Sequence, residues 1–265
     1  MAITNLNSGT RIDEIAEDIY RIHTPISPNR FPGGFSFNQY LIVDEEPLLF
    51  HTGWRKLFPL VKEAIASVMP VERLRYIAFS HYEADECGAL NEFLAIASFA
   101  VPLCGKIAAM TSIDDVADRP GRVLADGEEL KLGKHVVRWL DTPHLPHGWE
   151  CGYLFDSTAK TLLCGDLFTQ GGWVHPPITE QDILSASEAM REKFDYFSHA
   201  PSTRELLKKL AATEPTTLAC MHGAAWKGNG AQLLLALADE LESSKSLKVG
   251  GSDRGAIEAK TTTTI

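Results

Sequence analysis

The feature that most constrains this chain is a cluster of ionisable residues directly after an apolar segment. Residues 74–79 are typical of a buried strand, and the next nine residues read Ser-His-Tyr-Glu-Ala-Asp-Glu-Cys-Gly. Alternate side chains of an extended segment point the same way, so His81, Glu83 and Asp85 are expected to converge, with Glu86 beside them. A charge run alone is typical of a solvated face or of an acidic helix start. A metal site therefore needs further ligands elsewhere in the chain.

Three such candidates follow apolar runs later in the sequence: His147, Asp166 and His222. Loops at the ends of strands are where binding sites are commonly built. We expect one ion to be held by His81, Glu83 and His147. A second ion would be held by Asp85 and His222, with Glu86 as a further candidate. Asp166 would bridge the two ions, because each of its two oxygens can bind one of them.

The types of ligand indicate which metal is expected. Zinc hydrolase sites are usually rich in imidazole and thiolate, whereas this set joins three histidines to as many as four carboxylates. Carboxylates with imidazoles suit iron or manganese. The sequence therefore favours two iron ions and redox chemistry, with zinc or manganese as the alternative metals.

Composition excludes several other classes of protein. The 265 residues are 45% hydrophobic, which suits one globular domain over residues 1–242, and residues 243–265 are expected to be a disordered tail. Acidic residues number 35 against 25 basic ones, which argues against a nucleic-acid partner. No secretory signal or membrane-spanning run is visible, so a cytoplasmic location is expected. Five cysteines without a CxxC pair suit reduced, mostly buried thiols.

Hydrophobic periodicity gives the order of the expected elements. Strands are predicted near residues 19–23, 38–43, 48–52, 74–79, 99–104, 122–124, 129–132, 135–140, 152–155, 161–164 and 217–221. Helices are predicted near residues 57–68, 88–97, 106–117, 180–194, 203–212 and 230–242. This order is neither regular strand–helix alternation nor all-β, and it predicts a mixed α/β fold with two packed sheets and helices outside.

The candidate ligands also carry a resemblance to a known family. The run Ser80-His81-Tyr82-Glu83-Ala84-Asp85, together with His147, Asp166 and Met221-His222-Gly223, resembles the metallo-β-lactamase superfamily, whose usual run is His-x-His-x-Asp-His. Glutamate in place of the second histidine, as at Glu83, resembles the diiron branch of flavodiiron and oxygen-binding diiron proteins. The successive spacings from Asp85 to His147, from His147 to Asp166 and from Asp166 to His222 are 62, 19 and 56 residues. They are similar to that branch, and the resemblance covers about residues 19–242.

The resemblance implies a four-layer αββα sandwich with the ligand assignment given above. It also implies that the protein binds, and as an enzyme reduces, dioxygen or nitric oxide. Because the chain ends where a flavodoxin domain would begin, electrons are expected from an external donor such as a flavodoxin or a rubredoxin-like protein. Members of this branch are often homodimers, and the sequence leaves that state open here.

Two positions depart from the family pattern. Glu86 stands where the family has histidine, and Phe50-His51-Thr52-Gly53 replaces a turn that often contains aspartate. Two other functions therefore stay open. One is a dinuclear zinc hydrolase, which Glu83 disfavours because that branch has histidine there. The other is a non-catalytic oxygen sensor.

Several residues near the candidates have simpler interpretations. His144 is the less favoured alternative to His147, and His51 is either a partner of the site or a hydrogen-bonded turn residue. The remaining histidines are expected to be ordinary surface or core residues. Aromatic side chains that could line a dry pocket, although ordinary core packing is the simpler role for each, are Tyr82, Trp149, Phe168 and Trp173.

Overall fold

The computed structural model describes residues 2–250 and contains two sheets packed face to face. The first sheet has eight strands in sequential order, antiparallel from β1 to β5 and parallel from β5 to β8. Its strands are β1 (Ala2–Asn5), β2 (Thr10–Ala16), β3 (Ile19–Ile26), β4 (Phe35–Ile42), β5 (Leu48–Phe50), β6 (Tyr76–Ala78), β7 (Val101–Gly105) and β8 (Arg122–Leu124).

The second sheet has seven strands in the order β13-β15-β14-β12-β11-β10-β9. β12 and β14 are parallel neighbours, with two helices between them in the sequence. The strands are β9 (Glu129–Lys131), β10 (Val136–Asp141), β11 (Gly152–Asp156), β12 (Thr161–Leu163), β13 (Ile178–Thr179), β14 (Thr217–Ala219) and β15 (Ala225–Lys227).

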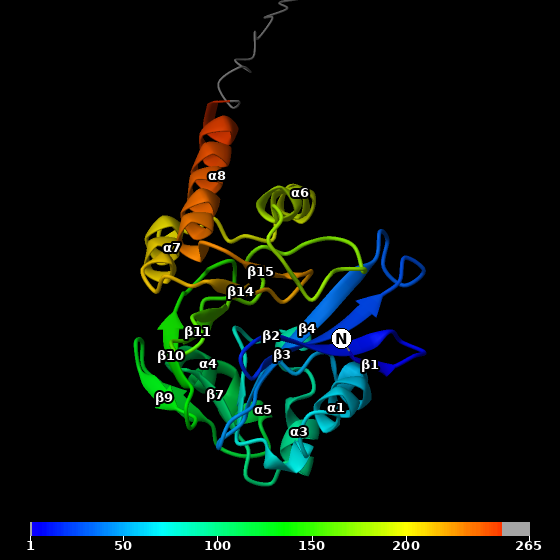
Figure 1. The fold of residues 1–265 in the computed structure, drawn as a ribbon. Coiled ribbons are helices and arrows are strands. Elements are labelled where there is room, and N and C mark those ends of the chain that lie inside the picture. Colours follow the sequence, from blue (N-terminus) through cyan, green and yellow to red (C-terminus); the bar gives the residue numbers. More distant parts are fainter. Residues whose placement is uncertain (1, 251–265) are drawn as a thin grey trace, which may run out of the picture.

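Helices cover the outer faces of the two sheets (Figure 1). Those of the first half lie on one side, namely α1 (Phe58–Ala66), the short α2 (Ala84–Cys87), α3 (Leu90–Ile96), α4 (Lys106–Ala108) and α5 (Asp114–Val116). On the opposite side lie α6 (Leu184–Phe194), α7 (Thr203–Ala211) and α8 (Gly230–Gly250). The predicted αββα sandwich is therefore confirmed.

Three buried apolar clusters hold the four layers together. Val61 of α1 and Phe93 of α3 pack on the first sheet, and Trp139 lies between the two sheets. On the outer face of the second sheet, Leu207 of α7 packs beside Leu234, Leu237 and Leu241 of α8. All five cysteines are buried and unpaired, as predicted. None of the helices within residues 2–250 has the length and hydropathy that crossing a bilayer requires.

The boundaries of three predicted helices are wrong. The helix expected over residues 106–117 is interrupted by a π-helical turn, Ala109–Ile113. α6 begins at Leu184 because Asp182 Oδ1 accepts hydrogen bonds from the backbone N–H groups of Leu184 and Ser185, at 2.8 and 3.2 Å.

The third helix, α8, continues beyond the predicted end at residue 242. No glycine or proline interrupts residues 231–249, so the sequence contains no strong helix breaker before Gly250. The tail expected from residue 243 is therefore helical up to Gly250. Residues 251–265 lie outside the described part of the chain.

Candidate metal centre

Loops at the ends of strands bring all seven candidate side chains together. The loop after β6 carries four of them, in and around α2. In the second sheet, the loops after β10, β12 and β14 carry His147, Asp166 and His222. Because β12 and β14 are parallel neighbours, Asp166 and His222 leave the sheet at the same edge. The candidate site therefore lies where loops of the two sheets meet.

The loop after β6 is extended only as far as Glu83. Glu83 has φ −133° and ψ 167°, and α2 begins at the next residue. The expectation of an extended segment through Asp85 is therefore wrong, because a helical turn and not strand alternation directs Asp85 and Glu86.

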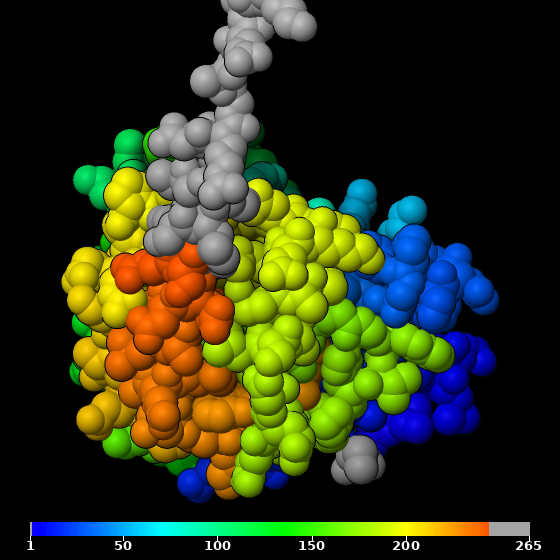
Figure 2. Space-filling model, turned by 90° about the horizontal axis from the view of Figure 1, so that it is seen from above, coloured from blue at the N-terminus to red at the C-terminus, as the bar shows by residue number. Residues whose placement is uncertain are grey.

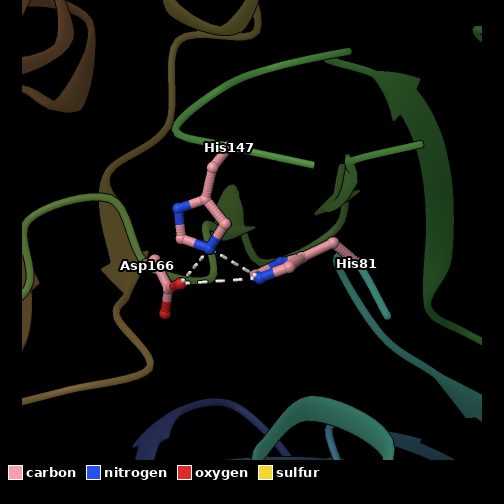
Figure 3. A group of neighbouring side chains, drawn as sticks. All are labelled: His81, His147 and Asp166. Carbon is pink, nitrogen blue, oxygen red and sulfur yellow. Dashed lines mark hydrogen bonds and ion pairs between the residues drawn. The ribbon is translucent and has the colours of Figure 1, made fainter. Parts of the chain in front are cut away.

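Four side chains form a first group of donor atoms. His81 Nε2 and His147 Nε2 lie 2.9 Å apart, and Asp166 Oδ2 lies 3.7 and 3.4 Å from them, respectively (Figure 3). Glu83 Oε1 is 3.6 Å from His81 Nε2 and 3.2 Å from His147 Nε2. Donor atoms that bind one transition-metal ion at about 2 Å are roughly 3 Å from one another. This group is spaced like the ligands of one ion.

A second group lies on the other side of Asp166. His222 Nε2 is 3.1 Å from Asp166 Oδ1 and 3.6 Å from Asp85 Oδ2. Asp166 thus turns Oδ2 toward the first group and Oδ1 toward the second. This is the arrangement that a bridging carboxylate requires.

Glu86 is completely buried and lies in the first group. Its Oε1 is 3.9 Å from His81 Nε2, and its carboxyl also interacts with that of Asp85, which was expected to accompany it at the second ion. The turn of α2 directs it toward His81. Neither carboxyl oxygen has a hydrogen-bond partner among the described residues. Burial raises the pKa of Glu86 well above its usual value.

Each of the three histidines uses its second nitrogen to anchor the ring. His147 Nδ1 donates to the carbonyl of Tyr196 at 2.9 Å, and His222 Nδ1 donates to the carbonyl of Ser36 at 2.8 Å. His81 Nδ1 contacts Ser80 Oγ at 3.0 Å. Such contacts fix the orientation and the tautomer of metal-binding histidines and leave Nε2 as the ligand atom.

His51 contacts Ser80, the residue before His81, which agrees with its predicted role as a partner of the site. It is completely buried, and its Nε2 contacts Ser80 Oγ at 3.0 Å. His144 is exposed and takes no part in the contacts of the cluster, whereas His147 contacts His81 and Asp166. Among the histidines expected to be ordinary, His23 and His135 are buried.

The two charge types in the cluster stabilise each other. Burial opposes ionisation of Asp166, but the imidazoles of His222, His81 and His147 hold the pKa of Asp166 below its usual value. Hydrogen bonding to His147 and His81 lowers the pKa of Glu83 to about 2. Burial likewise opposes protonation of His222, yet Asp166 and Asp85 raise the pKa of His222. The carboxylates therefore favour positive charge at this place.

The chemistry of the donors fits metal ions. His147 Nδ1 is a hydrogen-bond donor to a carbonyl, so the neutral ring presents a lone pair at Nε2, 2.9 Å from His81 Nε2. Beside these two nitrogens lie Asp166 Oδ2 and the carboxyl of Glu86, whose two buried oxygens lack hydrogen-bond partners among the described residues. A cation between these atoms would satisfy the whole set.

A small apolar pocket opens onto the cluster. Its volume is about 170 Å³, and it is lined by Phe31, Phe35, His147, Asp166, Thr169, Met190, Phe194, Tyr196 and His222. One wall comes from the loop between β3 and β4 and the other from α6, which adjoin on the face shown in Figure 2.

The aromatic residues singled out in the sequence do not line this pocket. Phe168 is completely buried in core packing, while Tyr82, Trp149 and Trp173 are exposed by 42%, 56% and 39%. The three phenylalanines that do line the pocket, Phe31, Phe35 and Phe194, lie far from the ligands in the sequence, and no sequence pattern pointed to them.

Residues 35–223, which contain all seven cluster residues, match the family described as "ODP family beta lactamase". This chain belongs to the ODP family.

Two curated relatives show which proteins the ODP-family chain is similar to. It is 29% identical to "Rubredoxin-oxygen oxidoreductase" of Megalodesulfovibrio gigas, over 74% of this chain and 50% of the relative. It is 24% identical to "Nitric oxide reductase" of Moorella thermoacetica, over 77% of this chain and 53% of the relative. The chain thus spans about half the length of these relatives.

A solved structure supports the fold. The flavodiiron protein from Giardia intestinalis superposes with a TM-score of 0.74 and 20% sequence identity, covering 88% of this chain and 59% of that one. The observed sandwich is therefore the fold of this group of structures.

Proposed function

We propose that this ODP-family chain is a non-haem diiron protein that binds dioxygen or nitric oxide and reduces it with electrons from an external donor. The observation that carries the proposal is the position of Asp166, with one oxygen facing His81 and His147 and the other facing His222. A site for a single ion would not require histidine ligands beside both oxygens of Asp166.

Iron is the metal that the donor set favours. Three imidazoles and four carboxylates converge, and no cysteine sulfur belongs to the groups of donor atoms found among the described residues. Carboxylates with imidazoles suit iron or manganese better than zinc. The name of the flavodiiron protein with the same fold supports iron as well.

The residues of this chain would perform three tasks. His81, Glu83 and His147, with Glu86 beside them, would hold one ion, and Asp85 and His222 would hold the other. The carboxylates would balance the charge of the ions. The carbonyls of Tyr196 and Ser36 would keep two of the imidazoles in position. Ferrous iron bound there would supply the electrons that reduce the gas.

The apolar pocket supports a small uncharged substrate. Phe35 stacks on His222 with ring centroids 4.4 Å apart, and Phe31 and Phe194 continue the apolar wall outward. Apolar walls disfavour water and ions but admit diatomic gases. The names of the two curated relatives agree with dioxygen and nitric oxide as the candidates.

Electrons would come from another protein. The name of one relative supports a rubredoxin as the type of donor. We expect no nucleic-acid or membrane partner and a cytoplasmic location, and homodimer formation stays open.

Consumption of gas by the iron-loaded protein tests this function. The chain would be loaded with ferrous iron without oxygen, given reduced rubredoxin, and supplied with dioxygen or nitric oxide in parallel electrode experiments. We expect catalytic consumption of at least one gas by the iron form and none by the zinc form. Reversible binding without consumption would identify a sensor. Hydrolysis of esters or lactams by the zinc form, with an inert iron form, would overturn the proposal.

A further inference from the structure

The three cluster histidines are not anchored in the same way. His147 and His222 each contact a backbone carbonyl through Nδ1, and a carbonyl can only accept. His81 contacts the hydroxyl of Ser80, which can donate or accept. The position of the Nδ1 proton of His81 is therefore not fixed by Ser80 alone, and another group must decide the direction of this hydrogen bond.

His51 is the group that decides it. Its Nδ1 lies 3.0 Å from Met221 Sδ, and a thioether has no proton to donate. Its Nε2 accepts from the backbone N–H of Ser80 at 3.3 Å, and a backbone N–H can only donate. Both contacts assign the proton of His51 to Nδ1 and leave Nε2 as an acceptor.

The direction of the remaining bonds follows. Because His51 Nε2 accepts, Ser80 Oγ donates its proton across the 3.0 Å contact. The oxygen of Ser80 is then the acceptor for His81 Nδ1–H, also at 3.0 Å. With its proton on Nδ1, His81 presents the lone pair of Nε2 to the cluster.

We propose that His51 is a positioning residue that acts through Ser80 to hold His81 in the tautomer able to bind metal at Nε2. The inference rests on the metal centre proposed above. It adds a residue that touches neither metal nor substrate.

Two further features support this role. His51 is completely buried and has φ +65°, a backbone conformation that is uncommon for a non-glycine residue. Its contacts with Ser80 and with Met221, the neighbour of His222, together link the loop after β6 to the loop after β14. A single imidazole thus connects segments that carry ligands from both sheets.

Metal affinity of designed variants tests the inference, with zinc alone as a redox-inert probe. His51→Leu removes the acceptor, Ser80→Ala removes the intermediate hydroxyl, and His51→Gln keeps an acceptor and a donor. We expect H51L and S80A each to weaken zinc binding about 10- to 100-fold, the usual effect of removing such a contact. The double variant should bind zinc no more weakly than either single variant, because both substitutions interrupt the same chain of hydrogen bonds. H51Q should recover most of the affinity.

Nuclear magnetic resonance gives a second readout on the zinc-loaded protein. The Nδ1 proton of His81 should be protected from solvent exchange in the wild type and H51Q, and should exchange faster in S80A and H51L. His135→Gln is the matched control, since this buried histidine lies outside the cluster contacts, and it should leave zinc affinity unchanged. Unchanged affinity in both H51L and S80A, or independent additive losses, would overturn the positioning role. Failure of the wild type to bind zinc or iron would instead overturn the metal centre.

Discussion

At the scale of single residues, Asp166 has a position that no other cluster residue shares. Its two oxygens face different histidines, with Oδ2 3.4 Å from His147 Nε2 and Oδ1 3.1 Å from His222 Nε2. A ligand that serves two ions should be more sensitive to substitution than one that serves a single ion. This difference leads to a prediction about metal content.

Replacing Asp166 with asparagine should lower the metal content from two ions per chain to one or fewer. The amide keeps the shape of the side chain but has only one oxygen and carries no charge. Metal analysis after dialysis against a weak chelator would measure the change. Asp114→Asn, at an exposed position, serves as the control and should retain both ions. Retention of two ions by D166N would contradict the bridging role.

A second prediction concerns pH and a residue pair outside the cluster. The hydrogen bond between His135 Nδ1 and Asp156 Oδ2, 2.7 Å long, raises the pKa of His135. A raised pKa in the folded protein means that the pair stabilises the fold fully below the unfolded value of about 6.5. The stabilisation is lost as pH rises through the raised value.

Comparison of the metal-free wild type with His135→Gln tests this expectation. The variant should lose about 1–3 kcal/mol of unfolding free energy near pH 6, the usual cost of an unpaired buried polar group. The loss should shrink above the raised pKa. Urea unfolding at several pH values would measure it. A difference that stays constant or grows with pH would show that the ion pair is not responsible.

Chemistry and spacing were enough to predict which side chains gather in the cluster. They could not predict the groups that orient those side chains, because the carbonyls of Ser36 and Tyr196 belong to the backbone and leave no mark on residue type. That Glu86 lies near His81 as well as Asp85 could not be predicted either, since it depends on the turn of α2.

At the scale of elements, the β3–β4 hairpin holds the loop that carries His222. Asn38 Nδ2 donates to the carbonyls of Cys220 and Gly223, both at 2.8 Å. The Tyr40 hydroxyl also donates to the carbonyl of Cys220, at 2.7 Å. The position of a second-sheet ligand therefore depends on polar side chains of the first sheet.

Substitution of Asn38 by leucine should affect both stability and metal binding. Two buried carbonyls would each lose one of two donors, since Tyr40 and Arg21 still donate to them, at a cost of about 0.5–1.5 kcal/mol per bond. Asn91→Leu is a matched control, because Asn91 Nδ2 donates to the carbonyl of Val116 away from the cluster. Chemical unfolding and zinc titration of both variants would measure the effects. We expect N38L to lose stability and affinity, whereas N91L should lose stability alone. Equal zinc affinities of the two variants would contradict the role of the hairpin.

Most long elements follow from hydrophobic periodicity, and those that were missed have physical reasons. In β2 the charged residues Arg11 and Asp13 pair with each other and Asp13 is buried, so the segment does not read as an apolar strand. β13 and β15 have only two and three residues, which is too short for a periodic pattern. β1 is mostly exposed and gives no strong signal.

At the scale of the whole molecule, the candidate centre joins the two sheets. The loop after β6 provides four side chains and the loops of the second sheet provide three. Ions bound there would connect the two halves of the sandwich. That residues 1–242 form a single domain stays a prediction.

Removing metal should therefore destabilise the entire sandwich. A ligand that binds only the folded state adds about 2.7 kcal/mol of stability at a free concentration of one hundred times Kd. Each kcal/mol corresponds to about 2–4 °C in Tm for a chain of this size. Calorimetry with and without a chelator would measure the shift, and hydrogen exchange should show lost protection near β6, β12 and β14 together. Loss of protection in only one of the two sheets would contradict the role of the metal centre in joining them.

The most direct test of the central claim is a crystal structure of the iron-loaded protein with anomalous diffraction data collected at the iron absorption edge. The account predicts two iron peaks, one beside His81, Glu83 and His147 and the other beside Asp85 and His222, with Asp166 between them. A single peak, or two peaks with Glu83 turned away from both, would contradict it.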